Sequence, residues 1–293
     1  MTRELKTVRD FLRYAVTTFT RADLHYGHGA GTAMDEAAFI VLEGLSLPID
    51  DINPWLDARL TAAERERLAG LIDARVTTRR PAAYLLGKAY VQGLPFYVDE
   101  RVIVPRSYIG EILAGEPAFL PAPQDVRSVL DLCTGSGCLA ILAALNYPEA
   151  EAHASDISAG ALDVAARNIA DYGLEDRITL HHGDLFEPLA GRTFDLIITN
   201  PPYVDEQAMM ALPPEYGAEP AIALAGGEDG LDIVRRILAE APARLSAGGG
   251  ILCEFGTGRE ILEEEYAHLD FLWPHSEEGE GEVFWLTREA FRS

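Results

Sequence analysis

The 293-residue sequence is poor in cysteine and in basic residues, and it lacks a long apolar segment. The three cysteines are an odd number in apolar stretches, so we expect a reducing cytoplasmic location rather than a disulfide framework. No run of about 18 apolar residues occurs, which argues against a membrane span. The N-terminus has mixed charge and no apolar core, so we do not expect a signal peptide.

Basic residues are scarce: 24 Lys and Arg stand against 47 Asp and Glu, and the net charge is −23. Binding to a nucleic-acid duplex depends on Lys and Arg that neutralise phosphates, so direct DNA binding is not expected. The acidity is compatible with a basic protein partner, attracted over long range, and also with solubility alone. His25 and His28, like His181 and His182, have no partners at ligand spacing, so we expect no metal site.

Residues 1–86 have the periodicity of helices. Apolar residues recur every three or four positions, and Thr61 with Glu64 forms a capping box at the start of a helix. We predict a small helical domain that recognises a substrate, with a purely structural cap as the alternative. Short apolar segments and turns across residues 87–105 predict a β-hairpin hinge that leads to a second domain.

Residues 106–293 alternate between strands and helices. Strands are expected at 126–132, 150–155, 178–182, 194–199 and 250–255, and helices at 138–146, 159–172, 230–245 and 258–266. This alternation predicts an α/β fold with a doubly wound, Rossmann-like parallel sheet. The connection between two last strands, 269–273 and 282–287, is too short for a parallel crossover, so we predict a closing hairpin with one antiparallel strand.

The motif Asn200-Pro201-Pro202-Tyr203 follows the apolar segment 194–199. A chain that leaves a parallel sheet at its carboxyl edge brings side chains to the ligand crevice. The two prolines stiffen this tip and remove backbone donors, so their carbonyl groups stay free to accept hydrogen bonds. The Asn200 oxygen and a proline carbonyl suit the two N–H bonds of a planar amino group, which Tyr203 would cover. A turn that only closes the strand is the alternative.

A glycine-containing loop connects the first strand with its helix and consists of Cys133, Thr134, Gly135, Ser136 and Gly137. Glycines let backbone N–H groups approach a ligand closely near a helix N-terminus. Asp131 stands just before the loop, and Asp156 ends the second strand, where a carboxylate can accept both hydroxyls of a ribose. These features predict a nucleoside-containing ligand, for which NAD and S-adenosylmethionine both qualify.

Three features favour S-adenosylmethionine. A negative Asp131 is unfavourable beside a pyrophosphate but favourable beside the ammonium of a methionine group. Asp184 and Leu185 follow the third strand and offer a carboxylate for an adenine amino group and an apolar contact for its ring. With Asn200 after the fourth strand, adjacent strand ends present ribose, adenine and amine sites along one crevice. Each acid alone is compatible with a capping or solvated residue, but the combination favours methyl transfer.

With the helical N-terminal part, these motifs resemble the HemK/Prm family of protein-glutamine methyltransferases over nearly the whole chain. Residues 104–107, Glu219 and residues 225–231 also match family patterns. One branch of the family methylates the glutamine of the Gly-Gly-Gln loop of peptide-chain release factors, and the PrmB branch methylates a glutamine of large-subunit ribosomal protein L-three. The release-factor branch usually has Gly and Pro where this sequence has Cys133 and Ser107, so the sequence is more similar to the PrmB branch.

The resemblance implies a class I methyltransferase fold and S-adenosylmethionine as the cofactor, with S-adenosylhomocysteine as its product. It implies that the cofactor lies along residues 133–137, with Asp156 at the ribose and with Asp184 and Leu185 at the adenine. A basic protein substrate, ribosomal protein L-three, is the implied partner.

For the acceptor, the resemblance implies that Asn200 and the Pro201 carbonyl bind the glutamine amide, with Tyr203 packed on it. We predict direct, in-line transfer of the sulfonium methyl group to the amide nitrogen; no general base is evident in the sequence. The alternatives are a release-factor glutamine methyltransferase, an adenine-amino DNA methyltransferase, an NAD oxidoreductase and a non-catalytic module of ribosome assembly.

Overall fold

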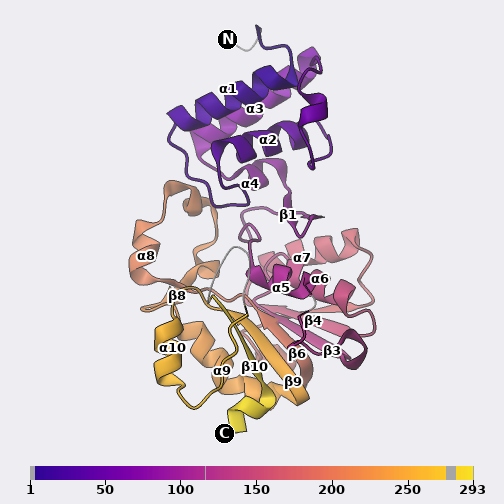
Figure 1. The fold of residues 1–293 in the computed structure, drawn as a ribbon, viewed down its shortest axis with the longest axis vertical. Helices are drawn as coiled ribbons and strands as arrows, with labels where there is room; N and C mark the ends of the chain where they lie inside the picture. Colours follow the sequence, from indigo (N-terminus) through magenta and orange to yellow (C-terminus); the bar gives the residue numbers. More distant parts are fainter. Residues whose placement is uncertain (1–3, 116, 275–281, 293) are drawn as a thin grey trace.

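The computed structural model describes residues 4–115, 117–274 and 282–292. The first part of the chain is helical and forms one end of an elongated molecule (Figure 1). It contains α1 (Val8–Arg21), α2 (Ala33–Gly44), the 3-10 turn η2 (Asn53–Trp55), α3 (Ala62–Thr78) and α4 (Ala82–Leu86). The predicted capping box is confirmed, because Thr61 and Glu64 each accept a hydrogen bond from the other's backbone N–H at the start of α3.

The helical part has a hydrophobic core of its own. Phe11 and Phe19 of α1 pack with Ile40 of α2 and with Leu68 and Ile72 of α3, and all five side chains are buried. The apolar periodicity of the sequence therefore corresponds to helix faces that meet one another. Within the described ranges, none of the helices combines the length and the apolar character that crossing a bilayer requires.

A short hairpin connects the helical part with the rest of the chain. Its strands β1 (Ala89–Val91) and β2 (Leu94–Phe96) pair in antiparallel fashion, as the sequence predicts. Residues 97–107 then continue as neither helix nor strand. Helix α5 (Tyr108–Ala114) begins after Ser107, whose hydroxyl accepts a hydrogen bond from the first turn.

A six-stranded sheet forms the second part, in the order β10-β9-β6-β3-β4-β5. All neighbours are parallel except β10, which is antiparallel to β9, so the predicted doubly wound sheet with one antiparallel strand is confirmed. The strands are β3 (Ser128–Leu132), β4 (Glu151–Asp156), β5 (Ile178–His182), β6 (Phe194–Thr199), β9 (Leu245–Glu254) and β10 (Val283–Thr287).

Helices cover both faces of this sheet (Figure 1). Val129 of β3 belongs to the core shared with α5 and α6, whereas Leu130 and Leu132 belong to the core on the opposite face, shared with α9 and α10. This alternation follows from the two-residue period of a strand. The helices of this part are α6 (Cys138–Asn146), α7 (Ala159–Asp171), α9 (Asp232–Arg244) and α10 (Arg259–Glu265), with the turns η3 (Pro123–Asp125), η4 (Glu187–Leu189) and η7 (Arg288–Arg292).

The predicted strand at 269–273 is wrong. In this segment Leu272 forms an isolated bridge to β10, whereas β10 pairs along its length with β9. The rings of Phe271 and Trp273 stack with their centroids 5.1 Å apart and pack on β10. The aromatic side chains of this segment therefore pack on one another and on β10 instead of forming a regular strand. Residues 275–281 of the expected hairpin lie outside the described residues.

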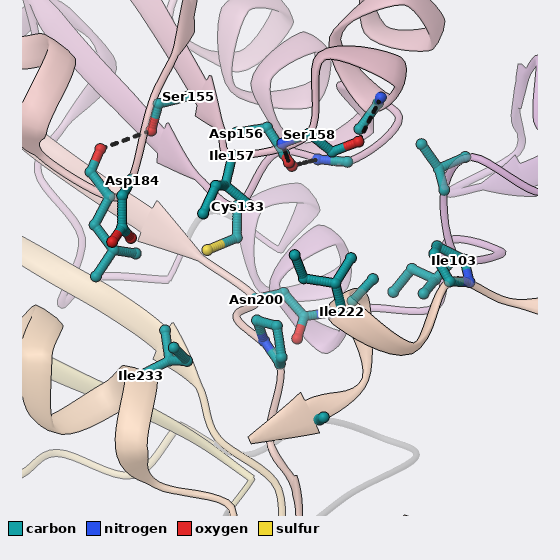
Figure 2. A pocket seen from close by; sticks show the side chains of 18 of the residues that line it. Ile103, Cys133, Ser155, Asp156, Ile157, Ser158, Asp184, Asn200, Ile222 and Ile233 are labelled. Atoms are coloured by element: carbon teal, nitrogen blue, oxygen red, sulfur yellow. Dashed lines mark hydrogen bonds between the residues drawn. The ribbon is translucent and has the colours of Figure 1, made fainter. Parts of the chain in front are cut away.

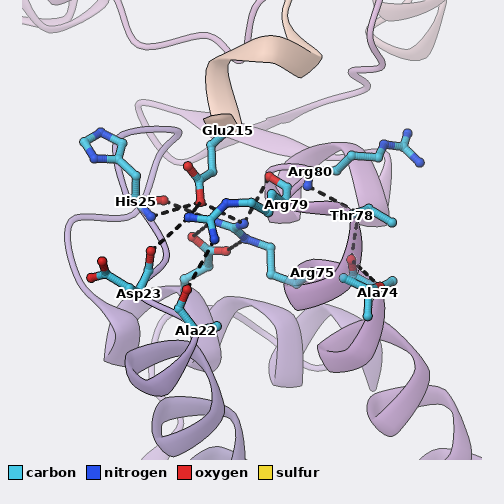
Figure 3. A network of polar contacts seen from close by, with 11 residues as sticks. Ala22, Asp23, His25, Ala74, Arg75, Thr78, Arg79, Arg80 and Glu215 are labelled. Carbon is cyan, nitrogen blue, oxygen red and sulfur yellow. Dashed lines mark hydrogen bonds and ion pairs between the residues drawn. The ribbon is translucent and has the colours of Figure 1, made fainter. Parts of the chain in front are cut away.

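Residues 204–227, here called the β7–β8 segment, leave the sheet after β6 and extend to the helical part (Figure 1). Glu215 in this segment is fully buried, accepts a hydrogen bond from the N–H of His25 and lies 2.7 Å from the Arg79 guanidinium (Figure 3). The segment therefore joins the two parts of the molecule. It contains β7 (Val204–Asp205), α8 (Glu206–Ala211), the turns η5 (Pro214–Ala218) and η6 (Ala221–Ala223), and β8 (Ala225–Gly227).

Candidate active site

A cavity of about 290 Å³ lies at the carboxyl ends of the parallel strands (Figure 2). It opens where the strand order reverses, with β6 on one side of β3 and β4 on the other, which is the usual ligand position in doubly wound sheets. We call it the larger cavity, to distinguish it from a second, smaller cavity that also contains Asn200 and is described below. The predicted site residues that line it are Cys133, Gly135, Asp156, Asp184, Leu185, Asn200 and Pro202.

The loop after β3 has an unusual backbone. Cys133, Gly135 and Gly137 have φ angles of +56°, +56° and +79°, and such angles favour glycine because an L side chain is strained there. Cys133 is therefore a strained non-glycine residue, and it lines the cavity. A Cβ atom on Gly137 would lie 3.1 Å from the Cβ of Ala165, so the glycine lets α7 pack directly on the loop.

Asp131 lies beneath this loop rather than in the cavity. Its side chain is buried, and Oδ2 accepts hydrogen bonds from the Thr134 hydroxyl at 2.5 Å and from the N–H of Ala140 at 3.0 Å. Burial raises the pKa of this carboxyl to about 7. Its Oδ1 is buried without a hydrogen-bond partner among the described residues. Asp131, together with the buried Thr134 and Ser136, therefore shapes the loop, whereas the sequence interpretation placed these residues directly at the ligand.

Two carboxyl groups line the larger cavity. Asp156 accepts hydrogen bonds from the N–H of Gly135 at 2.9 Å and of Ser158 at 2.8 Å, and burial raises its pKa. Asp184 forms an ion pair of 2.7 Å with Arg236 of α9. Carboxylate oxygens accept more than one hydrogen bond, so both groups can still receive donors from a ligand. Arg236 was not foreseen, because no local pattern links it to a residue so distant in the sequence.

Asn200 stands between two cavities. A second cavity of about 180 Å³, here called the smaller cavity, has Pro201 and Tyr203 in its wall together with Arg106. Asn200 lines both the larger and the smaller cavity. Its side chain has no hydrogen-bond partner among the residues that the structure describes, so its amide oxygen and amino group are available to a ligand. The structure thus brings the strand-end motif and the glycine-containing loop to one place.

Three glycines surround Tyr203. A Cβ atom on Gly226 would lie 2.6 Å from the Tyr203 Cα atom, one on Gly230 would lie 2.3 Å from the Tyr203 carbonyl oxygen, and one on Gly256 would lie 2.7 Å from its ring. Real side chains do not tolerate such distances from backbone atoms. The glycines therefore allow β8 and the loop after β9 to hold the Asn-Pro-Pro-Tyr motif closely.

Glu254, at the end of β9, contacts the same tyrosine. The Tyr203 hydroxyl donates to Oε1 of Glu254 at 2.8 Å, while Oε2 accepts from the Ser107 hydroxyl at 2.7 Å and from the N–H of Tyr108 at 3.1 Å. Burial raises the pKa of Glu254 to about 7. Sequence reasoning missed this residue as a site residue. Its only signal is a carboxylate at the end of an otherwise apolar strand.

Arg106, in the wall of the smaller cavity, is paired with Glu219. The guanidinium donates to both Glu219 oxygens, at 2.6 and 2.8 Å, and lies 5.6 Å from the ring centroid of Tyr216. Burial alone would raise the pKa of Glu219, but the paired guanidinium lowers it to about 2. His28 of the helical part lies 3.7 Å from the same carboxylate. The sequence showed that Arg106 and Glu219 match family patterns but assigned no role to either residue. The structure shows that they form a bidentate ion pair.

Comparison with known proteins decides the family. The chain is 56% identical to the ribosomal protein uL3 glutamine methyltransferase of Bradyrhizobium diazoefficiens, covering 97% of this chain and 91% of the relative. It belongs to this methyltransferase family. The protein of the same name from Bordetella pertussis is 52% identical over 99% of this chain and 98% of the relative, and that of Neisseria gonorrhoeae is 50% identical over 98% and 96%.

The fold comparison agrees with the family assignment. Residues 118–212 match the family model of the methyltransferase small domain. The hMettl16 catalytic domain, solved in complex with a 3'UTR hairpin, has a TM-score of 0.52 and 16% identity, and the match covers 78% of this chain and 81% of that chain. At that identity the match shows the fold alone. The predicted class I methyltransferase fold and the predicted membership among protein-glutamine methyltransferases, closest to the branch with ribosomal substrates, are confirmed.

Proposed function

We propose that this methyltransferase transfers a methyl group from S-adenosylmethionine to the side-chain amide nitrogen of a glutamine in ribosomal protein uL3. The observation that carries the proposal is the position of Asn200 between the larger and the smaller cavity. One cavity suits the donor and the other suits the acceptor side chain. The names of the relatives, which cover nearly the whole chain, support uL3 as the substrate.

The larger cavity fits S-adenosylmethionine. Asp156 offers carboxylate oxygens for the ribose hydroxyls, and Asp184 with the buried Leu185 suits an adenine. The loop of residues 133–137 would hold the methionine part, and the unpartnered Oδ1 of Asp131 beneath it favours a nearby cation. When bound, this cofactor supplies an electrophilic methyl group on a sulfonium centre.

The smaller cavity fits a glutamine side chain. The Asn200 oxygen and the Pro201 carbonyl can accept the two N–H bonds of the amide, and the Tyr203 ring can pack on its face. An amide nitrogen is a weak nucleophile because its lone pair is delocalised. Acceptors that hold both N–H bonds favour a pyramidal nitrogen as positive charge develops on it. Once the nitrogen carries the methyl group, one N–H proton is released to water, which leaves a neutral N-methyl amide. Alignment of the reacting atoms can lower the barrier by a further ~7–11 kcal/mol.

The acidic surface suits a basic acceptor protein. A net charge of −23 attracts a positively charged partner and repels a nucleic-acid duplex. This balance favours a protein substrate over adenine in DNA, although both carry a planar amino group. A release factor, whose glutamine would enter the same cavity, is the nearest alternative acceptor.

The test is methyl transfer from labelled S-adenosylmethionine, with purified uL3 and release factor offered side by side. We expect label on uL3 alone; label on the release factor alone would overturn the substrate assignment. Asn200→Ala should abolish transfer and leave cofactor affinity unchanged in calorimetry. The control is Asn146→Ala at the end of α6, which loses one hydrogen bond to the Leu113 carbonyl outside both cavities and should stay active. Equal loss of transfer and cofactor binding in Asn200→Ala would refute the acceptor role.

A further inference from the structure

Glu254 is a buried carboxyl group that the proposed chemistry does not use. Its side chain is 1% exposed, and among the described residues it forms hydrogen bonds but no ion pair with a cation. A carboxylate in such a place costs free energy of folding, since water is lost and no opposite charge replaces it. A glutamine or an apolar side chain would fill the end of β9 without this cost. The presence of a carboxylate at position 254 is therefore not explained by its contribution to folding stability.

The three donors to Glu254 come from two of the segments that contribute to the smaller cavity. The Tyr203 hydroxyl belongs to the Asn-Pro-Pro-Tyr motif, and the Ser107 hydroxyl and Tyr108 N–H lie where the hinge segment enters α5. Arg106, the residue next to Ser107, lines the smaller cavity together with the motif residues Asn200, Pro201 and Tyr203. One carboxyl group thus connects two of the segments that line the proposed acceptor site.

We propose that Glu254 is a positioning residue for methyl transfer, which sets the Tyr203 ring over the acceptor amide and ties it to the hinge segment through Ser107. The inference rests on the proposed function, because it assumes that the smaller cavity receives the glutamine. Glu254 touches neither the cofactor cavity nor the reacting atoms; it acts through Tyr203.

The geometry explains why a carboxylate suits this task. A tyrosine ring can rotate about two side-chain bonds, and Gly256 leaves no Cβ atom to block it from behind. The hydroxyl–carboxylate bond of 2.8 Å at the far end of the ring fixes the direction in which the ring points, because rotation about the Cα–Cβ bond would break it. When Glu254 is ionised, such charge-assisted hydrogen bonds are stronger than neutral ones. A glutamine at 254 offers a single acceptor oxygen, so it cannot receive Tyr203 and both hinge donors as a carboxylate does.

The experiment is a double-mutant cycle with Glu254→Gln, Tyr203→Phe and the double variant, with kcat and KM measured for the acceptor protein. We expect each single change to lower kcat about tenfold, the size expected for one lost charge-assisted hydrogen bond, and cofactor affinity to stay unchanged. The double variant should be no slower than Tyr203→Phe, because Glu254 acts through the hydroxyl that this variant lacks. Ser107→Ala should lower kcat by a smaller factor.

Additive losses in the cycle, or a Glu254→Gln effect on cofactor affinity equal to that on kcat, would overturn the proposal. Thermal melting of each variant separates loss of activity from loss of folding. Glu289→Gln, which changes an exposed acceptor of the Gly248 N–H, serves as the matched control and should leave kcat unchanged. The wild-type protein is assayed with uL3 and release factor first, and the cycle is run on the one it labels. A failure of the uL3 assignment is thereby visible in the wild type, apart from the outcome of the cycle.

Discussion

The buried carboxyl of Asp131 makes the stability of the protein depend on pH in a definite direction. Its pKa is about 7 in the folded protein, against an ordinary value of 3.8. The folded state therefore binds this proton more tightly than the unfolded state between these two values. The stabilising contribution is fully present below about pH 4 and is lost as pH rises through about 7.

The size of the effect follows from the two pKa values. The full difference corresponds to about 4 kcal/mol, of which about 3 kcal/mol falls between pH 5 and pH 8. Asp131→Asn removes the titrating group and with it this dependence. Relative to the wild type, the free energy of unfolding of Asp131→Asn should therefore rise by about 3 kcal/mol from pH 5 to pH 8.

Urea unfolding of both proteins without cofactor, at several pH values across this range, measures the difference. A matched control is Asp195→Asn, because four hydrogen-bond donors lower the pKa of Asp195 although burial opposes them. That group contributes stability that is lost as pH falls, so its variant should show no relative gain between pH 5 and pH 8. Parallel curves for wild type and Asp131→Asn would refute the reasoning.

Four further predictions follow from the contacts described above. Asp156→Ala should weaken cofactor binding first, and an unchanged affinity in calorimetry would exclude its ribose role. Gly256→Ala should push the Tyr203 ring aside and lower kcat at least about tenfold, whereas Gly173→Ala, with a similar φ of +64° and no atom within 4 Å of the new Cβ, should not. Glu215→Ala removes the ion pair with the partly exposed Arg79 and leaves the N–H of His25 without its acceptor, so it should cost about 2 kcal/mol in urea unfolding; a loss below about 1 kcal/mol would contradict this. Raising salt should slow association with uL3, and a flat rate would remove the steering argument.

Local sequence pattern was sufficient for several elements of the α/β part. The predicted bounds of β5, β6 and α6 agree with the structure residue by residue, because their apolar runs are bounded by polar or turn-forming residues. The segment 269–273 failed for the opposite reason. Its aromatic residues are partly buried by stacking on each other, and the sequence pattern alone does not distinguish this packing from pairing along a strand.

In the candidate site, too, residues that follow from local pattern were predicted and residues brought together only by packing were not. Asp156, Asp184 and Asn200 stand at or just after the ends of parallel strands, so their convergence on one cavity could be predicted from the sequence. Glu254 meets Tyr108 across 146 positions and Arg236 meets Asp184 across 52. Such contacts depend on how the layers pack, and a single sequence does not encode that in any short window. Asp131 was recognised as important, but its place beneath the loop was not predicted.

The burial of Glu215 between the two parts of the molecule limits how this enzyme can change over evolution. The segment that follows the Asn-Pro-Pro-Tyr motif reaches the helical part before it returns to the sheet, so the helices are not an interchangeable module attached by a linker. A recombination that brought in a different set of helices would leave the buried Glu215 carboxylate without the Arg79 guanidinium and the His25 N–H that it contacts. New substrates would then have to be acquired by substitutions within the existing helices rather than by exchange of the whole unit.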